Sequence, residues 1–128
     1  MSDPVWIETA DALAIHGELL QRFGGAAGVR DEKLLKSALD RPKNLHAYGE
    51  PSLFEMAAAY AAGIVKNHPF LDGNKRTGFI AAALFLESNG LHFQAPEEQA
   101  VERTFALAAG AIKEADYATW LEHSCGTV

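Results

Sequence analysis

Nine consecutive residues, His68 to Arg76, combine side chains that can carry out a group-transfer reaction. His68 can take a proton from an attacking hydroxyl, and Asp72 offers a hard oxygen ligand of the kind that Mg²⁺ uses together with substrate phosphates. Residues Gly73 to Arg76 are expected to start a helix, where free backbone N–H groups bind anions such as phosphate. We interpret the stretch as a candidate site for a metal-bound nucleotide and a hydroxyl acceptor.

Each of these residues, taken alone, also has an ordinary structural explanation. A His at a helix end complements the helix dipole, and an Asp or Asn before a helix is a common N-cap. Their concentration in one short loop between two apolar stretches favours the catalytic interpretation. We assign Phe70 to the core and Lys66 to solvent or the helix dipole, and we interpret the other histidines as surface or packing residues: His16, His46, His92 and His123.

The loop must be held by the two apolar segments that flank it. Ser52 and Glu55 form a capping-box pattern, which predicts a helix start, and two apolar stripes follow along this helix. Two stripes indicate that the helix is buried on most sides. After the loop, Asn74 begins a second helix, which ends at Asn89-Gly90 and is wholly apolar from Phe79 to Leu86. The pattern predicts a central helix pair.

The rest of the chain shows further helix boundaries. Thr9 is a candidate N-cap for a helix that Gly24-Gly25 ends, and Asp31 is one for a short helix that Pro42 ends. We expect a loop or hairpin over residues 41–51, a short strand over residues 91–93, a helix with Pro96 in its first turn that reaches Gly110, and a last helix opened by Asp116. The predicted fold is all-α, with about six helices, at most a small β-hairpin or flap, and a single domain over residues 1–128.

Composition and charge narrow the function. The formal net charge of −6 argues against direct binding to nucleic acid, for which a basic surface is expected. The longest apolar run, Met56 to Val65, is too short to span a bilayer. The lone Cys125 cannot form an internal disulfide and is expected in a frayed tail, so we predict a cytoplasmic protein without a membrane partner. Locally, Lys66, Lys75 and Arg76 form a basic island around Asp72.

The loop resembles the signature of the Fic family, H-x-F-x-(D/E)-G-N-x-R, and its Lys75-Arg76-Thr77 ending is similar to the death-on-curing (Doc) branch. This resemblance implies roles for single residues. His68 would be the base and Phe70 a core anchor, while Asp72 would hold Mg²⁺. The phosphates of ATP would lie against Gly73, Asn74, Lys75 and Arg76. By the same resemblance, Lys75 and Arg76 would be catalytic residues together with His68. A flap over residues 41–50 would dock the target.

The resemblance further implies a toxin of a type II toxin–antitoxin system that transfers a phosphoryl group from ATP to a protein hydroxyl. In the Doc branch the expected target is the translation factor elongation factor Tu. Family members that transfer AMP carry Gly and Arg where this chain has Lys75 and Phe79, so a bulky side chain fills space that their nucleotide uses. AMP transfer remains the alternative, because Gly73 is the Fic-like choice. A non-catalytic protein-binding module is the alternative from another class.

Control of the activity is expected to come from another protein. Self-restrained members of the family carry an inhibitory helix with the pattern (S/T)-x-x-x-E-(G/N), and no Glu of this chain is followed by Gly or Asn. The resemblance therefore implies a small antitoxin of the Phd kind, whose C-terminal segment folds as it binds.

Overall fold

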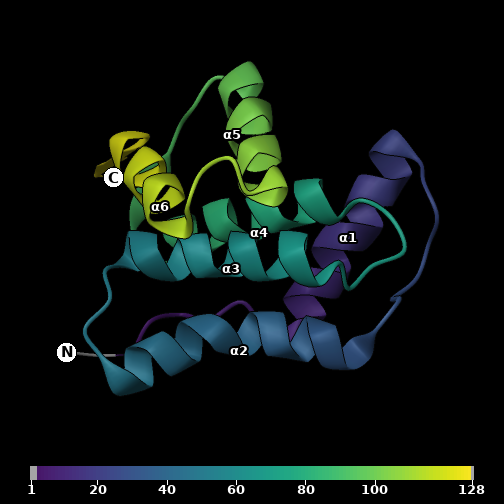
Figure 1. Ribbon diagram of the computed structural model, residues 1–128, viewed down its shortest axis with the longest axis horizontal. Helices are drawn as coiled ribbons and strands as arrows, with labels where there is room; N and C mark the ends of the chain where they lie inside the picture. The colour runs from purple at the N-terminus through teal and green to yellow at the C-terminus, as the bar shows by residue number, and fades with distance from the viewer. Residues whose placement is uncertain (1–2, 128) are drawn as a thin grey trace.

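The computed structural model describes residues 3–127, within which six helices and one small antiparallel sheet are found (Figure 1). This architecture confirms the prediction of an all-α fold of about six helices. No described helix is both long and apolar enough to cross a membrane. The elements are α1 Thr9–Phe23, α2 Glu32–Tyr48, α3 Leu53–Asn67, α4 Asn74–Ser88, β1 Leu91–Phe93, α5 Glu97–Ala109, α6 Glu114–His123 and β2 Cys125–Thr127.

Helix α3 forms the centre of the molecule. It begins at the predicted capping box, in which the Glu55 N–H donates to Ser52 Oγ at 3.1 Å and the Ser52 N–H donates to Glu55 Oε1 at 3.0 Å. Every residue from Met56 to Val65 is buried. Helix α2 packs along one side of α3, α6 covers another, and α4 runs beside it (Figure 1). The expected central pair is therefore α3 and α4, and the loop between them is held at both ends.

Glycines allow the neighbouring helices to approach α3 closely. A Cβ atom at Gly63 would lie 3.0 Å from the Cα of Ala38 in α2. A Cβ atom at Gly78 of α4 would lie 3.0 Å from Val65 Cγ1 and 3.2 Å from the carbonyl oxygen of Ala61. All three distances are shorter than ordinary van der Waals contacts, so a Cβ atom at either position would force its neighbours to move by a few tenths of an ångström.

The prediction for residues 41–51 was wrong, because α2 continues through Pro42 to Tyr48. Proline inside a helix removes one backbone hydrogen bond and is disfavoured by about 3 kcal/mol. Tertiary contacts offset this penalty. The Pro42 ring is fully buried, and Arg41 donates to the Ala59 carbonyl oxygen at 3.0 Å and to Glu114 Oε1 at 2.8 Å. The expected flap over residues 41–50 is therefore largely helical.

Smaller corrections concern the ends of elements. Glu8, not Thr9, is the N-cap of α1, and Lys113 is the N-cap of α6, so Asp116 lies in the first turn and accepts from the Lys113 N–H at 2.9 Å. Cys125 does not lie in a frayed tail. It opens β2 and pairs with Phe93 of β1, so the predicted strand at residues 91–93 has its partner at the end of the described chain.

The close α2–α3 contact predicts opposite effects for two Gly→Ala substitutions. Gly63→Ala should lower the free energy of unfolding by about 1–3 kcal/mol, because its methyl group overpacks the contact with Ala38. Gly17→Ala is the matched control, since Gly17 is exposed in α1 and has no atom within 4 Å of the added Cβ. It should raise stability by about 0.5–1 kcal/mol. Urea unfolding measures both, and equal effects would contradict the close packing.

Candidate active site

The loop between α3 and α4 begins with a left-handed turn at His68. His68 has φ 53° and ψ 53°, and it is the one described non-glycine residue with positive φ. Its N–H closes α3 by donating to the Ile64 carbonyl oxygen at 3.1 Å. This conformation is disfavoured by roughly 1–2 kcal/mol for an L-residue, so the surrounding contacts must hold it. The imidazole is exposed and leaves the helix at the mouth of a cavity.

A buried amide holds the middle of the loop. The Asn74 side chain accepts from the Phe70 N–H and donates to the Phe70 carbonyl oxygen, both at 2.9 Å. Phe70 is fully buried, and its ring stacks on His16 of α1 with ring centres 4.0 Å apart. The His16 Nε2 atom in turn lies 2.8 Å from the carbonyl oxygen of Asp72. The prediction that Phe70 anchors the loop and that His16 is a packing residue is confirmed.

The connection between α1 and α2 pairs with the outer edge of the loop. Val29 and Phe70 form an antiparallel bridge, and the Leu71 N–H donates to the Gly28 carbonyl oxygen at 3.1 Å. The Arg30 N–H donates to the Pro69 carbonyl oxygen at 2.6 Å. The loop is thus clamped from both sides, and the exposed side chains project from a rigid backbone.

Helix α4 begins without a side-chain cap. Gly73 is the N-cap and has φ 79°, a conformation that glycine adopts without strain. The first backbone bond of the helix runs from the Thr77 N–H to the Gly73 carbonyl oxygen at 3.0 Å. The N–H groups of Asn74, Lys75 and Arg76 therefore have no partner in the helix and form an anion site at the positive end of its dipole. By contrast, the capping box of α3 gives the third of these positions, the Glu55 N–H, a side-chain acceptor.

Asp72 lies directly before this helix start and is exposed. Its Oδ1 accepts from the Gly73 N–H at 2.8 Å, and its Oδ2 would lie 2.6 Å from a Cβ atom at Gly25. Gly25 thereby makes room for the carboxylate. Among the described residues no three His, Cys, Asp or Glu side chains gather into a metal site. A single carboxylate beside an anion site fits Mg²⁺, which is commonly held by one or two carboxylates together with substrate phosphates.

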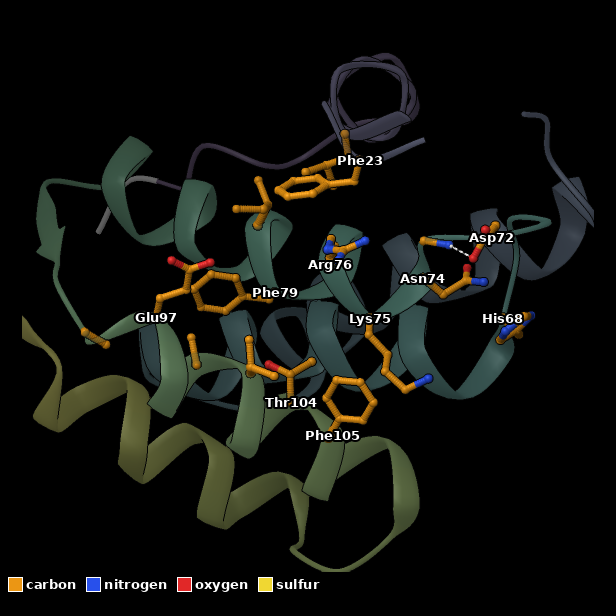
Figure 2. A pocket seen from close by; sticks show the side chains of 16 residues that line it. Phe23, His68, Asp72, Asn74, Lys75, Arg76, Phe79, Glu97, Thr104 and Phe105 are labelled. Carbon is orange, nitrogen blue, oxygen red and sulfur yellow. Dashed lines mark hydrogen bonds between the residues drawn. The ribbon is translucent and has the colours of Figure 1, made fainter. Parts of the chain in front are cut away.

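These groups open into a cavity of about 520 Å³ between α1 and α5, with α4 as its floor (Figure 2). His68 and Asp72 lie at one end and Glu97 at the other. Lys75 reaches toward α5, where its Nζ lies 5.0 Å from the centre of the Phe105 ring. Arg76 reaches toward α1, with its guanidinium 4.2 Å from the centre of the Phe23 ring. Cation–π contacts therefore hold the two cations on opposite walls.

All six residues predicted to form the site line this one cavity: His68, Asp72, Gly73, Asn74, Lys75 and Arg76. Asn74 differs from expectation in one respect, because its side chain is committed to Phe70 and only its backbone N–H is free for a phosphate. Sequence reasoning missed the aromatic walls, since Phe23 and Phe105 lie far from the loop along the chain. It also missed Gly25, which was interpreted only as a helix stop.

Tyr117, which contacts the cavity lining through Thr104, is not a candidate base. Thr104 lines the cavity, and its hydroxyl lies 2.8 Å from that of the buried Tyr117. Burial raises the pKa of Tyr117 to about 12, so its hydroxyl keeps its proton near neutral pH. Tyr117 is therefore not available as a base, and His68 stays the candidate at the loop end of the cavity.

The fold and the loop together define a class: an all-α protein in which a rigid loop between the two central helices carries His68, Asp72 and an open helix start. The family model described as the Fic/DOC family matches residues 6–86, and the chain belongs to this family. It is 32% identical to "Protein kinase doc" of Escherichia phage P1 over 123 residues, which cover 94% of this chain and 96% of that protein. It is also 43% identical over 77 residues to "Toxin Doc" of Mycolicibacterium smegmatis, covering 57% of this chain and 58% of that protein.

The buried amide of Asn74 predicts a stability effect. Asn74→Ala should lower the free energy of unfolding by about 1–3 kcal/mol for each Phe70 backbone group that loses its partner. Asn44→Ala is the control, because Asn44 is an exposed residue of α2 and Ala is the better helix former. Urea unfolding with amide exchange at Phe70 tests the difference. Unchanged protection of the Phe70 amide in Asn74→Ala would show that the amide does not hold the loop.

Proposed function

We propose that this protein is the toxin of a toxin–antitoxin pair and transfers the γ-phosphoryl group of Mg²⁺-bound ATP to a hydroxyl of a translation factor in the cytoplasm. The observation that carries the proposal is the cavity in which His68, Asp72 and the open start of α4 face one space. The names of the relatives, a protein kinase and a toxin, support it. The family resemblance points to elongation factor Tu as the target.

Each residue has a role that its position supports. The exposed His68 imidazole, held on a fixed turn, accepts the proton of the attacking hydroxyl. The free N–H groups at the start of α4 hold phosphate oxygens, and Lys75 and Arg76 neutralise the charge on the transferred group. Phosphoryl transfer depends mainly on such positioning and charge neutralisation. This small set of groups therefore includes each kind of group that the reaction needs from the protein.

The metal fits the residues at the loop end of the cavity. Asp72 is exposed beside the anion site, and Gly25 leaves room for its outer oxygen. When bound, Mg²⁺ would be held by this carboxylate and would neutralise part of the charge of the phosphates. The chain's own contribution is to hold the carboxylate in place through the Gly73 N–H.

Transfer of AMP is the second candidate, and two side chains argue against it. The Lys75 side chain, whose Nζ lies over the Phe105 ring, fills space in the cavity that the glycine of AMP-transferring members leaves open. Phe79 stands where those members carry a second arginine. Its ring packs against Phe93 and Trp120, with ring centres 5.6 and 6.3 Å away, so an apolar side chain replaces that cation here. Two cations beside the phosphates can neutralise the charge on a transferred phosphoryl group, so the site favours phosphoryl transfer over AMP transfer.

Labelled ATP separates these chemistries. Incubated with purified elongation factor Tu, the wild type should transfer label from γ-labelled ATP and none from α-labelled ATP. His68→Ala should lose about 10²–10⁴-fold of this rate, because the base is removed. Lys75→Gly should also lose γ-transfer, since a point charge on the phosphates is lost. Mass spectrometry of the product identifies the added group and its acceptor residue.

The outcomes distinguish the alternatives. Transfer of α-label alone would establish AMP transfer and overturn the kinase proposal. Full activity in a folded His68→Ala variant would remove His68 from the base role, and full activity in Lys75→Gly would make Lys75 a bystander. No transfer by the wild type to elongation factor Tu or to any protein of a bacterial lysate, combined with arrest of growth, would favour a non-catalytic binding module.

We further propose that the apolar part of the same cavity binds the antitoxin, a small Phd-like protein. Three of its lining residues are about half exposed: Phe23 at 55%, Val101 at 50% and Phe105 at 54%. An apolar groove between two helices suits an amphipathic helix that folds as it binds. Bound there, the antitoxin would cover Lys75 and Arg76.

A charge placed in this groove should weaken antitoxin binding. Val101→Glu is expected to lower the affinity for the C-terminal segment of the neighbouring gene's product by at least about tenfold, since a carboxylate would be buried against apolar side chains. Val5→Glu makes the same change at an exposed residue that does not line the cavity, and it should bind like the wild type. Titration calorimetry measures both, and equal affinities would place the antitoxin elsewhere.

A further inference from the structure

Arg30 connects the start of α2 with the end of α3. Its Nε donates to the carbonyl oxygen of His68 at 2.7 Å, and its terminal Nη2 donates to that of Asn67 at 2.8 Å. These carbonyls lie at the end of α3, where the helix itself supplies no donor and the dipole favours a cation. The guanidinium therefore caps α3 from a distant part of the chain.

The backbone of Arg30 is itself immobilised. Its N–H donates to the Pro69 carbonyl oxygen, and the adjacent Val29 forms the bridge with Phe70. On the other side, Asp31 caps α2 by accepting from the Leu34 N–H at 3.0 Å. The guanidinium thus extends from a segment that is held on both sides. Its two hydrogen bonds therefore tie the carbonyl groups of Asn67 and His68 to the start of α2.

The two hydrogen bonds bear directly on the unusual turn at His68. The turn has positive φ, which an L-residue adopts only where its neighbours hold it. Within the described residues, the hydrogen bonds of His68 involve its backbone alone: its N–H to Ile64 and its carbonyl oxygen from Arg30. Among the described residues the ring makes no hydrogen bond and no aromatic stacking contact, so the backbone turn sets the direction in which the His68 side chain leaves the chain.

We propose that Arg30 is a positioning residue for His68: its guanidinium holds the Asn67 and His68 carbonyls and thereby keeps the left-handed turn that aims the imidazole into the cavity. The role of the imidazole as a base rests on the proposed function, whereas the link between Arg30 and the turn does not. A lysine could reach one carbonyl at a time, because it lacks the planar fork of donors that bridges both.

The test compares Arg30→Met, which lacks donors, and Arg30→Lys with the wild type. The φ angle of His68 is measured by NMR couplings, and kcat and the KM for ATP are measured in the transfer assay. Arg30→Met should shift φ away from the left-handed region and lower kcat by at least about tenfold, because a misplaced catalytic group slows the reaction steeply. The KM for ATP should stay within about twofold, since the phosphate-binding N–H groups at the start of α4 are unchanged. Arg30→Lys should give intermediate values.

Arg22→Met is the matched control. It removes the same charge from an exposed arginine whose ion pair with Glu18 lies on the surface of α1. It should alter neither φ nor kcat. A drop in kcat with an unchanged His68 φ in either Arg30 variant would overturn the proposal, as would an unchanged φ with an unchanged kcat. If Arg30→Met does not fold, Arg30→Lys decides. If the wild type transfers no phosphoryl group, the φ measurements still decide the role of Arg30, and the proposed function alone fails.

Discussion

The close contact of α3 with the helices on either side of it is the constraint on which the rest of the structure depends. A methyl group at Gly63 or Gly78 would lie 3.0 Å from the nearest atom of the neighbouring helix, closer than ordinary van der Waals contact. The positions of α2 and α4 relative to α3 are therefore set by backbone contact rather than by adjustable side chains. Because the loop runs from the end of α3 to the start of α4, the packing of these two helices fixes its two ends independently of the contacts that the loop itself makes.

The loop itself divides structural and chemical roles between neighbouring residues. Pro69, Phe70 and Asn74 are buried and fasten the backbone, whereas His68 and Asp72 are exposed and carry reactive groups. Because buried residues hold the backbone, the exposed side chains keep their positions while remaining in contact with solvent. Burying the charged groups instead would require additional hydrogen-bond or ion-pair partners. This division explains how a loop so short presents an imidazole, a carboxylate and free backbone N–H groups together.

The cavity connects the proposed chemistry with the proposed control. Its loop end is polar, and its walls beyond Lys75 and Arg76 are aromatic and half exposed. The cations rest on Phe105 of α5 and Phe23 of α1, so a partner that displaces these rings also displaces the cations. An antitoxin bound in the groove would thus act on the catalytic groups directly, without a change in the fold.

The sequence by itself determined the features that depend on local pattern. Such a pattern involves residues only a few positions apart. The structure confirms two features predicted in this way, the capping box at Ser52 and the pair of apolar helices that flank the loop from His68 to Arg76. The family signature added roles: the six residues expected to act on the nucleotide or the acceptor line the cavity, and Phe70 is buried as the expected anchor.

Only the tertiary structure decided the features that depend on contacts between distant segments. Locally, Pro42 ends a helix. The helix continues because the buried ring and the bonds of Arg41 to α3 and α6 outweigh the lost backbone bond. Cys125 becomes a strand residue because β1 supplies its partner, and Arg30 reaches the end of α3 because the chain folds back beside the loop. No local pattern encodes such pairings, since their free energy arises only when both segments are in place.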